Sequence, residues 1–486
     1  MSIRKELASG IFYTSLAKYS GIVVSLVISA ILSRLLTPED FGIVAVATVL
    51  IAFFNILGDI GIGPAIIQRQ KLSQHDYRSI FSITIIIGLM LSMMFFLVSP
   101  LIAGYYGNNE LTNICRCLSL IILFTCINIV PLNLQYKSKN FKKVGIVTLL
   151  VQIFAGFCAV SYALAGGGAY SLVLSSVIST ATLAIIYIYL SRLTPTFRIK
   201  KNAIDKILSF SLYQAMFNII NYLTRNLDKL LIGRYIGLGQ LGYYEKSYRL
   251  MMMPLQNITF VITPVLLPVF VSLHDNISEM MTKYNKLLEI LSYIAFPLTV
   301  LMFFCAEEII LLFFGNQWVD AVEPFRILSV TIAFQMLISS TGSIYQAADR
   351  TRELFITGCW GAFFMITAFV LTIFVWGTIN AVCIGYVFAQ IANSIQTFSF
   401  LYNTLDSPLK AMLRHLKIPV IIAVILAAVL FGISFLTGDT SLFLSLCIKV
   451  CVWAIILILL LHFISPINLV SLKKAGIKKY ILSLVN

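Results

Sequence analysis

The sequence predicts an all-α polytopic membrane protein of about fourteen transmembrane helices, built as two parallel-repeat six-helix lobes plus two C-terminal helices. Its 486 residues are 59% hydrophobic. Only 11% are charged, against roughly 25% in soluble domains. Apolar runs of about 20 residues, the length that crosses a bilayer as a helix, recur along the whole chain. The second half of the chain also repeats features of the first half, which predicts the two lobes.

The apolar runs place the individual spans. They cover residues 10–35, 41–67, 80–103, 112–135, 144–165, 168–190, 207–234, 242–271, 287–312, 324–346, 354–376, 379–402, 416–437 and 441–464. The first run is too long for a cleaved signal peptide and lacks a small-residue cleavage site, so we predict it to be a span. The predicted organisation is an N-terminal lobe (1–190), a basic cytoplasmic linker (191–206), a second lobe (207–402) and a C-terminal extension (403–486) of two helices and a basic tail.

The basic residues that give the net charge of +15 follow the predicted membrane topology. Lys and Arg gather in alternate connections, such as the linker 191–206. The intervening connections, for example 37–40 (TPED) and 306–308 (AEE), contain none. The positive-inside rule then places both termini in the cytoplasm, in agreement with an even number of spans. This distribution argues against a nucleic-acid partner.

An internal repeat with a shift of about 200 residues relates the two lobes. Residues 31–34 (ILSR) match 231–234 (LIGR), and Phe41-Gly42 matches Leu241-Gly242. Pro64 aligns with Pro264. Each unit of six spans inserts in the same direction, because six is even. Transporters with parallel repeats place their substrate near the bilayer midplane between the repeats, so we expect a site there.

The seventh predicted span carries a polar stripe that a lipid-facing helix could not tolerate. Its members recur at steps of three, four or seven residues: Gln214, Asn218, Asn221, Arg225, Asp228 and Lys229. A cation at the centre of a bilayer helix costs about 2.5–3.5 kcal/mol on insertion scales, so the stripe must face protein or water. The first span repeats the pattern with Thr14 and Lys18. Together they predict a cationic cavity.

The candidate substrate-binding residues are therefore cations of the predicted spans: Lys18, Arg225, Lys229, Lys246, Arg249, Arg34, Arg234 and Lys449. Arg34 and Arg234 lie near the outer ends of their spans, where a snorkelling side chain is the alternative. Arg225 and Asp228 are three residues apart and could instead form a structural ion pair.

Asp59 and Asp228 are candidates for coupling transport to a proton or sodium gradient, because a buried carboxylate can exchange protons. For Asp59 the alternative is a cap on backbone groups at the glycine-rich break of the second span. Gly61, Gly63, Pro64 and Pro264 interrupt their helices and are candidate hinges for gating.

No catalytic or cofactor site is predicted, and the chain is interpreted as a non-enzyme. The nine cysteines lie in apolar runs, and the close pairs Cys115/Cys117 and Cys447/Cys451 have no carboxylates or histidines beside them, so no metal site is expected. The sequence has no Walker-type phosphate loop. A large extramembrane loop for glycan synthesis is missing as well.

Several segments resemble the Wzx-type polysaccharide flippases of the multidrug/oligosaccharidyl-lipid/polysaccharide exporter superfamily, and in particular the exopolysaccharide and colanic-acid branch. They are residues 33–42 (SRLLTPEDFG), 57–61 (LGDIG), 241–244 (LGYY) and 314–318 (FGNQW). The resemblance implies transport of undecaprenyl-diphosphate oligosaccharides to the outer leaflet of the bacterial inner membrane by alternating access. The product would be O-antigen, capsule or exopolysaccharide.

The same resemblance implies a monomer that works with a polysaccharide polymerase and a chain-length regulator. It also implies a groove for the lipid tail at the last two helices, near Lys449. The alternatives are a multidrug cation antiporter, which would need an acidic cavity, and a peptidoglycan-precursor flippase, which fits the charges equally well. A membrane-embedded glycan polymerase is the alternative from a different class.

Overall fold

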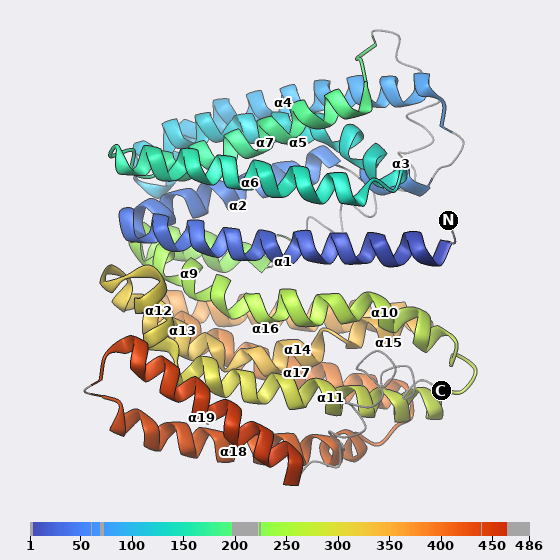
Figure 1. The fold of residues 1–486 in the computed structure, drawn as a ribbon, viewed down its shortest axis with the longest axis vertical. Helices are drawn as coiled ribbons and strands as arrows, with labels where there is room; N and C mark the ends of the chain where they lie inside the picture. The colour runs from blue at the N-terminus through green and yellow to red at the C-terminus, as the bar shows by residue number, and fades with distance from the viewer. Residues whose placement is uncertain are drawn as a thin grey trace. The chain divides into compact units, whose positions relative to one another are not determined.

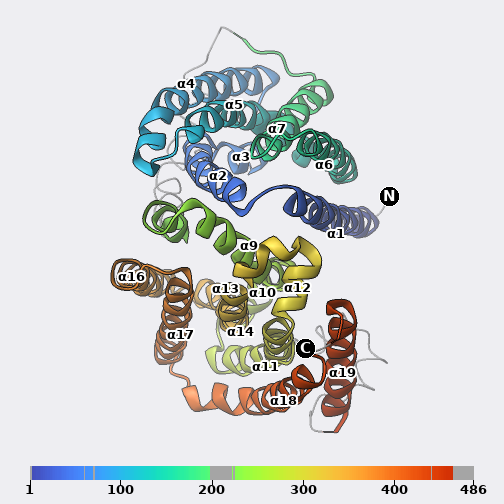
Figure 2. The same cartoon turned by 90° about the vertical axis from the view of Figure 1, so that its left-hand side faces the viewer.

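The computed structural model describes residues 3–59, 61–68, 72–196, 222, 225–438 and 440–463, with side-chain environments from Lys18 onward except at 260–265. These residues form helices joined by turns and short loops, without a strand among them (Figures 1 and 2). Two compact units divide between Gly242 and Tyr243 and are called unit 1 and unit 2. The all-helical fold class is confirmed, whereas the predicted boundary at 191–206 stays a prediction.

Unit 1 contains the first seven helices, a helical segment at 225–235 and the start of α9. The helices are α1 (Ile3–Leu35), α2 (Pro38–Asp59), α3 (Ile62–Gln68), α4 (Gln74–Tyr106), α5 (Glu110–Lys137), α6 (Phe141–Leu164) and α7 (Tyr170–Ser191). Helix α5 is central, since α2, α3, α4, α6 and α7 all pack against it. A Cβ at Gly88 of α4 would lie 2.8 Å from the Cβ of Cys126 in α5, so the glycine allows these helices to approach closely.

The second predicted span is broken where the sequence indicated a break. Helix α2 ends at Asp59, Gly61 has a φ of 76°, and α3 starts at Ile62. The left-handed backbone conformation at Gly61 is strained for other residues, which explains glycine at this position. The Asp59 carboxylate accepts a hydrogen bond from the Gly63 backbone N–H at 3.2 Å, which is the capping role proposed as the alternative for Asp59.

A close backbone crossing joins the starts of α2 and α9. A Cβ at Gly42 would lie 1.8 Å from the Leu238 carbonyl oxygen, and a Cβ at Gly242 would lie 1.9 Å from the Pro38 carbonyl oxygen. The two contacts are related by the repeat shift that pairs 38 with 238 and 42 with 242. The matched glycines of the repeat are therefore explained by packing, because any side chain would separate the two backbones.

Unit 2 contains most of α9 and the remaining helices. They are α9 (Leu238–Pro254), the π-helical turn η1 (Leu255–Thr259), α10 (Phe260–Val271), α11 (Ile277–Phe304), α12 (Ala306–Phe314), the 3₁₀ turn η2 (Asn316–Ala321), α13 (Val322–Ser329), α14 (Thr331–Ile338), α15 (Thr341–Ala347), α16 (Thr351–Val375), α17 (Ile379–Thr404), α18 (Leu409–Leu436) and α19 (Leu442–Phe463). Helix α11 contacts α12, α13, α14, α18 and α19, and α16 pairs with α17. Buried aromatic side chains such as Tyr284, Tyr345 and Tyr402 fill the core around α11.

Eleven helices among the described residues are long and apolar enough to cross a membrane, or twelve if a helix pair bent by 46° at Val330 counts as one span. The predicted count of about fourteen is not confirmed. Most of the predicted span 207–234 lies outside the described residues. The predicted span 242–271 is divided into α9, η1 and α10, because Pro254 at its middle cannot donate a helical hydrogen bond.

Candidate functional site

Four cations predicted to bind substrate are exposed in unit 1. Lys18 and Arg34 lie on α1, and Arg225 and Arg234 lie on the segment 225–235. Lys229 on the same segment is half-buried. All five belong to predicted spans, where an exposed charge is stable only beside water, lipid headgroups or an anionic group. The stripe residues Gln214, Asn218 and Asn221, and Thr14 of the first span, are outside the residues whose side chains the structure describes.

The acidic member of the stripe is separated from Arg225. Asp228 is 1% exposed, whereas Arg225 is exposed, and the described contacts contain no ion pair between them. One Asp228 carboxylate oxygen accepts the Lys229 backbone N–H at 2.8 Å. The structural ion pair considered for Arg225 is therefore absent from the described contacts, and its guanidinium is accessible. This accessibility keeps Arg225 as a candidate for anion binding.

Arg234 lies against an aromatic side chain. Its guanidinium carbon is 4.9 Å from the centre of the Tyr105 ring, and the neighbouring Tyr106 hydroxyl donates to the Leu230 carbonyl oxygen at 3.2 Å. These contacts fasten the segment 225–235 to the end of α4. A guanidinium that stacks through its face still has N–H groups at its edge to donate.

Lys246 is enclosed by aromatic rings. It is 3% exposed, and its ammonium lies 4.7 Å from the centre of the Phe314 ring and 5.3 Å from that of Trp318. Next to it, Ser247 donates to the Ala321 carbonyl oxygen at 2.9 Å. Lys246 thereby packs α9 onto the FGNQW segment, a contact that the sequence did not predict. Arg249, one turn further on, is exposed, so the structure separates these two candidate ligands.

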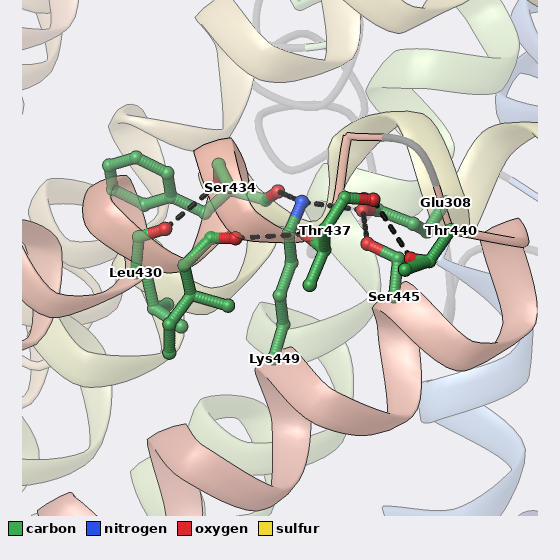
Figure 3. Close-up of polar contacts among 9 residues, drawn as sticks. Glu308, Leu430, Ser434, Thr437, Thr440, Ser445 and Lys449 are labelled. Atoms are coloured by element: carbon green, nitrogen blue, oxygen red, sulfur yellow. Dashed lines mark hydrogen bonds and ion pairs between the residues drawn. The ribbon is translucent and has the colours of Figure 1, made fainter.

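Lys449 is buried in a polar cluster of unit 2 (Figure 3). Its ammonium donates to Glu308 Oε1 at 2.5 Å and to the Phe304 carbonyl oxygen at 3.1 Å. Ser445 donates to the same Glu308 oxygen at 2.6 Å. Glu308 was expected in an outer connection, but it lies in α12 and is 4% exposed. The sequence did not predict this pairing, although a lysine deep in an apolar helix is a signal for a buried partner such as a carboxylate or backbone carbonyl.

The candidate hinge residues lie at or near helix breaks. Gly61 and Gly63 flank the start of α3, and Pro64 is in its first turn. Pro264 lies within α10. Lys137, the last residue of α5, donates to the Ile66 carbonyl oxygen at 2.9 Å and to the Tyr77 hydroxyl at 2.8 Å. It ties the end of α5 to α3 and α4, and thus to the segment beyond the break.

The fold and the charged groups in its spans define a polytopic helical membrane protein. A family model described as polysaccharide biosynthesis protein matches residues 31–323. The lipopolysaccharide biosynthesis protein WzxC of Escherichia coli (strain K12) is 26% identical over 432 residues, which cover 87% of this chain and 86% of the relative. The teichuronic acid biosynthesis protein TuaB of Bacillus subtilis (strain 168) is 26% identical over 361 residues, covering 73% and 74%.

The solved structure titled Lipid II flippase MurJ, inward closed conformation, has the same fold. Its TM-score is 0.73 at 14% sequence identity, and the alignment covers 92% of this chain and 98% of that chain. The chain belongs to the polysaccharide biosynthesis protein family. The resemblance drawn from the segments 33–42, 57–61, 241–244 and 314–318 is thereby confirmed.

Proposed function

We propose that this chain is a flippase that moves undecaprenyl-diphosphate-linked oligosaccharides across the bacterial inner membrane for surface-polysaccharide biosynthesis. The observation that carries the proposal is the set of exposed cations on predicted spans of unit 1, with Arg225 accessible and not ion-paired to Asp228. A diphosphate needs such groups, because cationic side chains and water inside the protein must take the place of bulk solvent around its charges in the membrane. The family and the names of WzxC and TuaB support the polysaccharide pathway.

Transport, rather than catalysis, fits the distribution of the charged groups. The exposed charged side chains described on α1 and on the segment 225–235 are cations, which can bind phosphate oxygens. A transporter has to release the bound phosphate again after it has crossed. The proposed orientation has both termini in the cytoplasm, supported by the basic residues on alternate connections. Alternating access coupled to a proton or sodium gradient completes the proposal, with the broken segment at Gly61 as a place where the helix bends.

The proposal is tested by flipping of a fluorescent undecaprenyl-diphosphate oligosaccharide in proteoliposomes. Arg225→Gln, Lys229→Gln and Arg249→Gln are compared with the parent, and Lys143→Gln, an exposed cation at the start of α6, is the control. A charge-assisted hydrogen bond contributes about 1.5–3 kcal/mol, so we expect loss of about tenfold or more in rate for a cation that contacts the diphosphate.

Three outcomes would contradict the proposal or a part of it. Flipping at parental rates in all three variants would exclude these cations from the diphosphate path. A parent that transports a multidrug cation but not the lipid-linked oligosaccharide would support the antiporter alternative. A flipping rate that is unchanged when both the proton and the sodium gradients are collapsed would contradict the proposed coupling to an ion gradient.

A further inference from the structure

Three side chains four residues apart form one polar face on α19. Ser445, Lys449 and Trp453 lie on the same side of the helix because successive steps of four nearly complete whole turns. Ser445 and Lys449 both donate to Glu308 Oε1, and Lys449 also reaches the Phe304 carbonyl oxygen. The Trp453 indole N–H donates to the Pro297 carbonyl oxygen at 3.0 Å. The acceptors run from Pro297 in the C-terminal part of α11 to Glu308 in α12, so this face follows the two helices for several turns.

The rest of α19 packs only in part. Its buried residues are Ser445 and Lys449, and partly buried Ile456, Leu457, Leu460 and Leu461 pack against the cluster of Tyr293, Ile422 and Leu426. Lys449 is 6% exposed, whereas Phe443 is 68% and Ile455 is 58% exposed on the other sides of the helix. In a bilayer these outer side chains contact lipid tails, and burying them against protein provides no hydrophobic driving force. Hydrogen bonds and the charge pair therefore act together with this van der Waals packing in holding α19 in place.

The neighbouring helix α18 does not supply alternative partners for Glu308. Ser434 donates to the Leu430 carbonyl oxygen at 2.9 Å, and Thr437 donates to the Ile433 carbonyl oxygen at 3.0 Å (Figure 3). These hydroxyls are used within α18. Glu308 Oε2 is buried without a hydrogen-bond partner among the described residues, so the contacts of this carboxylate come from α19 through Oε1.

We propose that Glu308, Ser445, Lys449 and Trp453 form an intramembrane lock that fixes α19 to α11 and α12. Lys449 is then a positioning residue and not a ligand for the anionic cargo, because Glu308 neutralises its charge and two acceptors occupy its ammonium. The lock concerns unit 2 alone, and it rests on the proposed function only where flipping is the readout.

The test is a double-mutant cycle on thermal unfolding of the full chain in detergent. Lys449→Met removes the charge and keeps the length of the side chain, and Glu308→Gln removes the opposite charge. Each single variant strands a buried charge, so we expect unfolding temperatures several degrees below the parent. The double variant should fall by less than the sum of the two singles. Lys410→Met, at an exposed lysine of α18, is the control and should match the parent.

A charge exchange gives a second, independent measurement. Glu308→Lys combined with Lys449→Glu should regain most of the unfolding temperature that Glu308→Lys alone loses, because the pair is restored with opposite polarity. Single variants that unfold with the parent, or an exchange that rescues nothing, would overturn the lock. If the single charge variants do not fold, Trp453→Phe, which removes one hydrogen bond and keeps an aromatic ring, tests the same face of α19.

Flipping separates positioning from ligand binding. The variant with both Glu308→Gln and Lys449→Met should flip the lipid-linked oligosaccharide at close to the parental rate, since neither charge contacts the cargo. A double variant that is stable but inactive would overturn the assignment of Lys449 as a positioning residue. If the parent itself flips nothing, the proposed function fails, whereas the unfolding cycle still decides whether the lock exists.

Discussion

Replacing Gly242 with alanine tests the backbone crossing between α2 and α9. The new Cβ would lie 1.9 Å from the Pro38 carbonyl oxygen, while real Cβ atoms stay beyond 3.0 Å from such a neighbour. The obstacle is backbone and cannot turn aside as a flexible side chain can. The two helix starts must therefore separate by about 1 Å or more, and overpacking of this kind costs about 1–3 kcal/mol, occasionally more.

The chain supplies a matched control on the same helix. A Cβ at Gly239 would meet nothing within 4 Å, so Gly239→Ala should be neutral or slightly stabilising. Thermal unfolding in detergent, monitored by fluorescence and by circular dichroism, compares the two variants at the same detergent concentration. We expect Gly242→Ala to unfold several degrees below Gly239→Ala.

The repeat-related contact strengthens this test. In Gly42→Ala the new Cβ would lie 1.8 Å from the Leu238 carbonyl oxygen, so this variant should lose about as much free energy of unfolding as Gly242→Ala. Once one alanine has separated the helix starts, the second has less to displace. The double variant should therefore lose less than the sum of the single losses. Equal unfolding temperatures for Gly242→Ala and Gly239→Ala, or fully additive losses, would refute the close crossing.

Three other changes test contacts within single units, each by thermal unfolding. Lys137→Met removes the hydrogen bonds to the Ile66 carbonyl and the Tyr77 hydroxyl, so we expect it to lower the free energy of unfolding by about 1–3 kcal/mol. The control Lys143→Met, at an exposed site, should change it little. Tyr402→Phe removes the hydrogen bond that the Tyr402 hydroxyl donates to the buried Asn285 side chain, so it should lower the free energy of unfolding by about 1–3 kcal/mol. The same change at the exposed Tyr189 should have no effect. Lys139 has a φ of 56°, so Lys139→Gly should stabilise the chain by up to about 1 kcal/mol, and a fall in unfolding temperature would contradict this reasoning.

Apolar runs predicted most helices well, because a span must be long and uncharged to cross a bilayer. They were less informative about helix ends. Helix α4 covers Gln74–Tyr106 where the apolar run suggested 80–103, since its first turns carry polar residues and begin with a Ser73 capping box. The predicted span 287–312 consists of parts of two helices, α11 and α12, which meet at a turn at Cys305. The apolar run continues through this turn, so hydrophobicity alone could not predict it.

The cations predicted to bind substrate have different surroundings in the structure. Residue spacing along one helix does not reveal these surroundings, because they depend on the neighbouring helices. Arg225 and Lys246 are both cations of predicted spans, yet one is exposed and the other is enclosed by Phe314 and Trp318. The partner of Lys449 is 141 positions away along the chain, so no local periodicity could indicate it. The cap at Asp59 was anticipated because its glycine neighbours are local in sequence.

The crossing of α2 and α9 has the form of an interface between two identical subunits. Gly42 meets the segment that begins at 238, and Gly242 meets the equivalent segment that begins at 38, so each copy uses the same surface as the other. Such an isologous contact is what a two-fold symmetric dimer forms. The two glycines therefore depend on each other, because a side chain at either position would widen both arms of the same contact.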